Sequence, residues 1–255
     1  MRAYRKCLRT AVRGCFHSLP RGFRYPPTAP VLSSFSNASS GASDLQLLSD
    51  DISYFASKKQ TGVSLRTLTE TGRGEFVQEV VEVDASKQDA GRRQRMLFQV
   101  AMFLHRELPI RLAHRVRDLD CIPHLSTLPS TRAVRQMYAT SFEEIRAAST
   151  PNTIAREGAF ADLLQNVYSR HSAVLLMMAR SAYEARSNLK DANSFTQQDE
   201  VHQFLDSFYM SRIGIRMLIG QYLALRDEAD SNYVGLVSQH CSPAHVAHNA
   251  MEDAK

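Results

Sequence analysis

Residues 204–218 read FLDSFYMSRIGIRML, and the spacing of side chains in this stretch decides the fold. Apolar residues recur there at intervals of three and four, which is the spacing of one face of an α-helix. The aligned positions, which continue past the stretch, are Leu205, Phe208, Arg212, Ile215, Ile219 and Tyr222. We therefore predict an amphipathic helix over about residues 196–226.

Three upstream segments show the same periodicity and extend the helical prediction. They cover about residues 92–118, 130–148 and 151–189. Pro109 lies inside the first segment and is expected to kink or restart that helix, because proline cannot donate the interior hydrogen bond. Short connections join the four helices, which predicts an all-α fold with an antiparallel four-helix bundle over residues 92–228.

Residues 44–91, which precede the bundle, are predicted to form a short helix and an irregular segment. Asp50 or Asp51 would cap a helix that ends near Lys58. Residues 76–83 read FVQEVVEV, and this pattern predicts either a short strand or an extended loop.

The first 43 residues differ in composition from the rest of the chain. They hold seven of the 31 basic residues and no acid, and their later part is rich in Ser and Pro. This composition is typical of an organellar transit peptide followed by a linker, and a disordered basic tail is the alternative. A secretory signal is not predicted, because no continuous apolar stretch of roughly 7–15 residues is present.

The rest of the chain is close to neutral, because 24 basic and 26 acidic residues follow from Asp44 onward, a net charge of −2. A nucleic-acid-binding surface is therefore not predicted. The longest apolar run, residues 173–179, is far shorter than the ~20 residues that span a bilayer, so no membrane span is expected. Cys121 and Cys241 lack the spacing of metal ligands, and no metal site is predicted.

Five polar side chains interrupt the apolar faces of the predicted helices. They are Arg212 and Arg216 on the last helix, His171 on the third, and Tyr138 and Ser141 on the second. A charge inside a core is costly unless it is paired, so the two arginines need an anion. One hypothesis is an internal ion-pair network with Asp206 or a glutamate of the first helix. The other is a pocket in which the arginines bind a carboxylate, the Tyr and His complete the site, and apolar walls accept an aliphatic tail.

Catalytic sequence motifs are missing from the 255 residues. The chain has no glycine-rich phosphate-binding loop of the Walker or dinucleotide type, no nucleophile elbow and none of the usual protein-kinase motifs. No catalytic residue is therefore predicted in this chain, which by itself should bind no cofactor.

Two segments resemble the mitochondrial 2-oxoacid dehydrogenase kinases. Residues 204–218 are similar to that family's FYMSRxxIRML signature, and residues 104–114, LHRELPIRLAH, are similar to its QELPVRLA motif. The resemblance covers roughly residues 45–255. The stretches ELPIRLAHR and SRIGIRML favour the branched-chain type of kinase and FYMSR favours the pyruvate type, so both types stay open.

The resemblance implies a protein of two parts. The first is a four-helix bundle similar to histidine-kinase phosphotransfer bundles, and the second is a GHKL-type ATP-binding domain. Residues 229–255 resemble the start of the linker into that second domain, which this chain would lack. Members of the family are mitochondrial matrix enzymes that use ATP and Mg²⁺ to phosphorylate serine on the dehydrogenase component, and this inactivates the complex.

The resemblance also implies partners and a ligand for the bundle. The family's bundle docks on the lipoyl-bearing transacylase core and holds a pocket for a 2-oxoacid effector; a homodimer is left open. The positions that match this pocket are Arg212, Arg216, His171, Tyr138 and Ser141.

The chain departs from the family pattern in two places. Ser172 and Ala173 follow His171, where the family has a polar pair ending in Asp, and residues 75–91 resemble an insertion. Two hypotheses remain for the protein as a whole. One is a kinase whose sequence continues beyond this chain, and the other is a non-catalytic, lipoyl-docking and 2-oxoacid-sensing module that lacks kinase activity.

Overall fold

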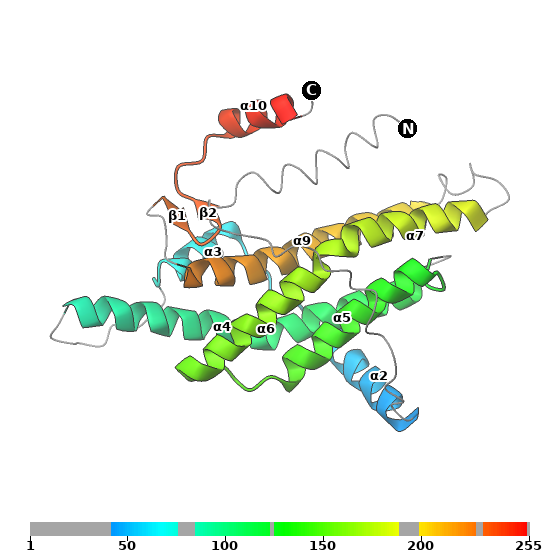
Figure 1. Cartoon of the computed structure of the whole chain (residues 1–255), viewed down its shortest axis with the longest axis horizontal. Coiled ribbons are helices and arrows are strands. Elements are labelled where there is room, and N and C mark those ends of the chain that lie inside the picture. Colours follow the sequence, from blue (N-terminus) through cyan, green and yellow to red (C-terminus); the bar gives the residue numbers. More distant parts are fainter. Residues whose placement is uncertain (1–41, 76–84, 123–124, 189–198, 228–231, 254–255) are drawn as a thin grey trace.

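The computed structural model describes residues 42–75, 85–122, 125–188, 199–227 and 232–253. Helices make up most of these residues, and one two-stranded hairpin accompanies them (Figure 1). The all-α prediction is confirmed. The predicted transit peptide and the predicted strand or loop at residues 76–83 lie outside the described residues.

Helix α4 (Ala85–Cys121) is the longest element and runs through Pro109 without ending. Leu104, Leu108 and Leu112 on its inner face are fully buried. Of the two effects expected of Pro109, a restart of the helix is wrong, since burial of this apolar face outweighs the loss of one backbone hydrogen bond, and a kink stays a prediction. The helix also begins earlier than the predicted residue 92, because Gly91 is tolerated inside it.

Helix α5 (Pro129–Ala147) follows after a short turn, with a proline in its first turn where the missing N–H is not needed. Its buried face carries Val134, Tyr138, Phe142 and Ile145. Its bounds agree with the predicted residues 130–148.

The segment predicted as one helix over residues 151–189 is broken into three elements. These are α6 (Ile154–Arg170), the 3-10 turn η1 (His171–Ala173) and α7 (Val174–Asn188). The prediction of a continuous helix is therefore wrong. The break coincides with hydrogen bonds from two arginines of the next helix to backbone carbonyls at the end of α6. Those contacts join residues that are far apart in the sequence, so the helical periodicity of the segment cannot predict them.

Helix α9 (Asp199–Arg226) contains the stretch that decides the fold and ends at the predicted residue. Two shorter helices come earlier in the chain. Helix α2 (Ala42–Ala56) begins before the predicted acidic cap. Helix α3 (Leu65–Gly72) was not predicted, although the Ser64 side chain caps it by accepting a hydrogen bond from the Thr67 N–H.

After α9 the chain forms a hairpin of β1 (Tyr233–Val234) and β2 (Val237–Ser238), which are antiparallel. Gly235 adopts φ 59° in the turn, a left-handed conformation that favours glycine. Helix α10 (Pro243–Asp253) follows, exposed throughout and set apart from the other helices (Figure 1).

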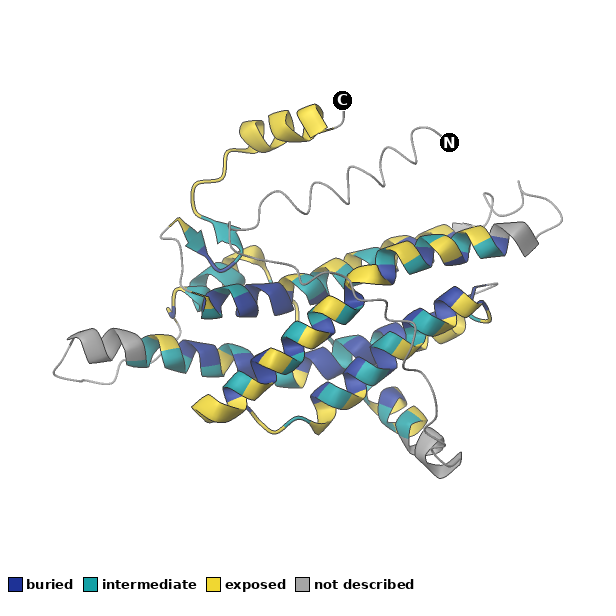
Figure 2. Ribbon diagram, in the orientation of Figure 1, coloured by how far each residue is buried: buried dark blue, intermediate teal, exposed yellow. Residues whose placement is uncertain are grey.

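Helices α4, α5, α6, α7 and α9 pack together into what we call the helical body. Helix α4 contacts α5, α6 and α9, while α5 also contacts α7 and α6 also contacts α9. Figure 2 shows the buried faces of these helices turned towards one another. Large buried side chains such as Tyr138, Phe142, Phe160, Phe208 and Tyr222 fill the space between them. Among the described helices, none combines the length and apolar character needed to cross a bilayer.

Candidate functional site

The five residues singled out from the sequence come together around the break between α6 and α7. Tyr138 and Ser141 lie on α5, His171 occupies the break itself, and Arg212 and Arg216 reach it from α9. We call these five residues the polar cluster. Three separate helical segments therefore meet at one group of polar side chains, in which Tyr138, Ser141 and His171 are buried and the two arginines are partly buried.

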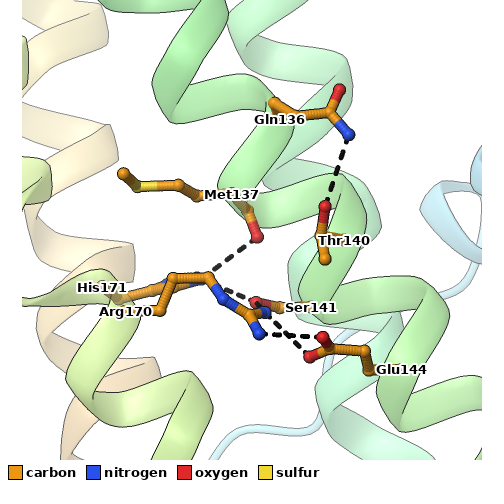
Figure 3. Close-up of polar contacts among 7 residues, drawn as sticks. All are labelled: Gln136, Met137, Thr140, Ser141, Glu144, Arg170 and His171. Atoms are coloured by element: carbon orange, nitrogen blue, oxygen red, sulfur yellow. Dashed lines mark hydrogen bonds and ion pairs between the residues drawn. The ribbon is translucent and has the colours of Figure 1, made fainter. Parts of the chain in front are cut away.

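His171 is buried and sits at the centre of the cluster. Its Nε2 lies 2.9 Å from the Ser141 Oγ and 3.4 Å from the carbonyl oxygen of Met137 (Figure 3). Burial above all, together with the charges of Arg170, Arg216 and Arg212, lowers the pKa of His171 to about 4, against the opposing effect of the Met137 hydrogen bond. The imidazole is therefore neutral near pH 7 and adds a polar group without a charge.

Arg170, which the sequence analysis missed, holds Ser141 in place. Its guanidinium donates to the Ser141 Oγ at 2.9 Å and pairs with both carboxylate oxygens of Glu144 at 2.8 Å (Figure 3). The only sequence signal for Arg170 was its position next to His171, because its partners Glu144 and Ser141 lie 26 and 29 residues away. This bidentate pair orients Ser141 towards the imidazole.

Arg212 and Arg216 contact the carboxyl-terminal end of α6. Arg212 donates to the carbonyl oxygen of His171 at 3.2 Å, and Arg216 donates to that of Tyr168 at 3.0 Å. The Arg216 guanidinium also lies over the Tyr168 ring, 3.8 Å from its centroid. The end of a helix carries partial negative charge, which favours these cations. The glutamate expected from the first helix does not join them, because Glu107 pairs with Arg111 at 2.9 Å.

Tyr138 places its hydroxyl group inside the core with no hydrogen-bond partner among the described residues. Its ring centroid lies 4.5 Å from that of His171 and 5.9 Å from that of Phe208. Burial raises the pKa of Tyr138 to about 12, although nearby positive charges oppose the shift. The hydroxyl is thus a protonated donor whose hydrogen bond is not made, and such groups are uncommon in folded proteins.

Arg115 of α4 is a further cation near this hydroxyl and was also missed from the sequence. It is buried, pairs with Asp118, and is one of the charges that act on Tyr138. Burial lowers the pKa of Arg115, while Asp118 opposes that shift. Positive charge and a hydroxyl donor with no described partner therefore converge at this point of the core.

A protein-family model described as mitochondrial branched-chain alpha-ketoacid dehydrogenase kinase matches residues 62–238, well over half of the chain. This chain belongs to the mitochondrial 2-oxoacid dehydrogenase kinase family. The resemblance noted from the two sequence motifs is thereby confirmed.

Curated members of the family share sequence over much of this chain. A mitochondrial pyruvate dehydrogenase kinase of Arabidopsis thaliana is 39% identical over 210 residues, which is 82% of this chain and 52% of that protein. Corresponding kinases of Ascaris suum and Drosophila melanogaster are each 32% identical, over 60% of this chain and 39% and 38% of their own lengths. The chain spans about half, or less, of the length of these family members.

The names of these family members agree with the mitochondrial expectation for the chain. The matching family description refers to the branched-chain complex, whereas the curated kinases are named for the pyruvate complex. The comparisons therefore leave both the branched-chain and the pyruvate type of kinase open.

ATP and Mg²⁺ are the cofactors that membership of the family implies. No group of three His, Cys, Asp or Glu side chains in the described part of the chain is arranged to hold a metal ion.

Proposed function

We propose that this chain is the regulatory and docking part of a mitochondrial matrix protein serine kinase. The kinase would phosphorylate the dehydrogenase component of a 2-oxoacid dehydrogenase complex and so inactivate it. Membership of the family and the names of its curated relatives support this function. ATP and Mg²⁺ would be bound outside this chain, by the remainder of a longer protein.

We interpret residues 92–228 as an antiparallel four-helix bundle of the phosphotransfer type. The four helices of the proposed bundle are α4, α5, the α6–α7 segment and α9. The contacts among these helices support the interpretation. Residues 1–43 would be the transit peptide with its linker, and residues 229–255 the start of the connection to a GHKL-type domain. The partners would be a lipoyl-bearing transacylase core, the dehydrogenase component and a second copy in a homodimer.

The observation that carries the regulatory part of the proposal is the buried Tyr138 hydroxyl, which has no hydrogen-bond partner among the described residues although the charges of Arg212, Arg115 and Arg216 act on it. We propose that the polar cluster binds the carboxylate and oxo oxygens of a 2-oxoacid. Arg212 and Arg216 would donate to the carboxylate, and Tyr138 would donate to an oxygen of the ligand.

Each residue of the cluster has a distinct role in this proposal. Ser141 and neutral His171 would present polar atoms without adding charge, and Phe208 would contact the aliphatic tail. Because the cluster joins α5, α9 and the α6–α7 break, a bound ligand would hold these segments together. A conformational readout of 2-oxoacid concentration follows from that coupling.

The kinase function is tested on the endogenous protein. An antibody against the helical body would be used to purify the protein from mitochondria and to measure its mass. We expect a band well above the 28.7 kDa of this chain, and transfer of phosphate from ATP to the dehydrogenase component when Mg²⁺ is present. A band below 28.7 kDa without phosphate transfer would instead support the non-catalytic docking module.

A further inference from the structure

A second positively charged site lies away from the polar cluster, where the start of α4 meets the end of α9 and the hairpin (Figure 1). It is a surface hollow of about 330 Å³, lined by Arg73, Arg92 and Arg93 and by apolar side chains that include Met96 and Leu225. We call it the arginine hollow. No residue of the polar cluster lines it.

The positive charge of the arginine hollow is poorly compensated. Arg92 makes one long hydrogen bond of 3.4 Å to the Gly74 carbonyl oxygen, and its buried Nε has no partner among the described residues. Within the described ranges, neither Arg92 nor Arg93 forms an ion pair with a carboxylate. Arg73 has a long, exposed ion-pair contact of 3.7 Å with Glu75, and its Nη2 donates a hydrogen bond of 3.1 Å to the neutral Gln239 side chain. A partly buried guanidinium in this state gains from an external anion.

Arg93 is held by backbone groups and is therefore preorganised. Its Nη2 donates to the carbonyl oxygens of Leu225, Arg226 and Asp227 at 3.4, 2.9 and 3.0 Å, at the end of α9. These bonds satisfy donors without neutralising the charge. The guanidinium is thus fixed beside the hollow while it stays cationic.

The opposite wall is apolar and is also fixed. Met96, Leu225 and Val234 are buried side chains of this wall. Gln221 holds the hairpin in place, since its Nε2 donates to the Val234 carbonyl oxygen at 3.0 Å and its Oε1 accepts from the Leu236 N–H at 2.8 Å. A rigid wall of this kind accepts the apolar body of a ligand at little cost in conformational entropy.

We propose that the arginine hollow binds a small phosphorylated organic molecule, with its phosphoryl group on Arg92 and Arg73 and its apolar body on the Met96 and Leu225 wall. A phosphoryl dianion fits this charge better than a carboxylate, because its oxygens engage two guanidinium groups together. The volume of about 330 Å³ suits a small organic ligand.

The test is calorimetric titration of the 255-residue chain with phenyl phosphate, inorganic phosphate and benzoate at equal ionic strength. We expect saturable binding of phenyl phosphate, at least tenfold tighter than that of the other two anions. Arg92→Gln should weaken phenyl phosphate binding at least tenfold, and Arg73→Gln, at a more exposed position, should weaken it severalfold. Arg66→Gln is the matched control, since Arg66 is exposed on α3, pairs with Glu70 and does not line the hollow.

Several results would overturn the proposal. These are the absence of saturable phenyl phosphate binding, equal binding of benzoate, and unchanged affinity in both Arg92→Gln and Arg73→Gln. Equal affinity for inorganic phosphate would refute the role of the apolar wall. Circular dichroism of each variant establishes that it is folded before its affinity is compared.

Discussion

Arg216 of α9 donates a hydrogen bond of 3.0 Å to the carbonyl oxygen of Tyr168, and its guanidinium carbon lies 3.8 Å from the centroid of the Tyr168 ring. One side chain thus engages both the backbone and the ring of the same residue, close to the end of α6. Together with the Arg212 bond to His171, this contact fastens α9 to the point where α6 breaks.

The contact predicts the effect of shortening Arg216. Arg216→Ala removes a charged hydrogen bond and a cation–π contact, so the free energy of unfolding should fall by about 1–3 kcal/mol. Arg216→Lys keeps the charge but loses the planar fork, and should lose less. Urea denaturation followed by circular dichroism measures both values. An alanine variant as stable as the wild type would show that the contact contributes nothing.

The buried imidazole of His171 predicts a dependence of stability on pH. Its pKa is lowered to about 4 in the folded protein, from 6.5 in the unfolded chain. Between these values the unfolded state binds more protons, so stability is complete above about pH 6.5 and falls as the pH drops towards 4. The loss over that interval should be about 3 kcal/mol for this residue. His171→Asn should flatten this part of the profile, and an equally steep profile in the variant would refute the assignment.

The Gln221 bonds predict how the hairpin is held. Gln221→Ala removes both hydrogen bonds, to Val234 and Leu236. The hairpin should therefore open more often, because the free energy of opening it away from α9 should fall by about 1–3 kcal/mol. Hydrogen exchange at the Leu236 amide, whose partner is lost, should become faster by at least tenfold. Gln165→Ala is the control on the exposed face of α6, and similar exchange in the two variants would argue against the anchor.

The sequence predicts elements whose causes are local. The periodic faces of α5 and α9 place their ends within a few residues, and the five residues of the polar cluster were found because polar side chains are unusual on such faces. The break at His171 could not be predicted, because the contacts that accompany it join His171 and Tyr168 to arginines that lie 41 and 48 residues further along the chain. Arg115 and Arg170 were missed for the same reason, since exposed and buried arginines look alike in sequence.

Helix α3 was missed for a different reason. Its eight residues are too few to display a periodic pattern, and Ser64 alone marks its start. The continuity of α4 through Pro109 likewise depends on packing against α5 and α9, which outweighs a strong local signal.

The 2-oxoacid site in the polar cluster is tested most directly by melting temperature, measured on the 255-residue chain with and without 4-methyl-2-oxopentanoate or pyruvate. A ligand that binds only the folded state raises the melting temperature by mass action. Tyr138→Phe is the decisive variant, because it removes a hydroxyl that has no described partner and should leave the free protein as stable or slightly more stable.

We predict that one of the two 2-oxoacids raises the melting temperature of the wild type, that Tyr138→Phe reduces this rise, and that Arg212→Ala abolishes it. The ligand with the larger effect identifies the branched-chain or the pyruvate type. A rise that is equal in the wild type and in both variants, or no rise with either 2-oxoacid, would contradict the assignment of the polar cluster as the effector site.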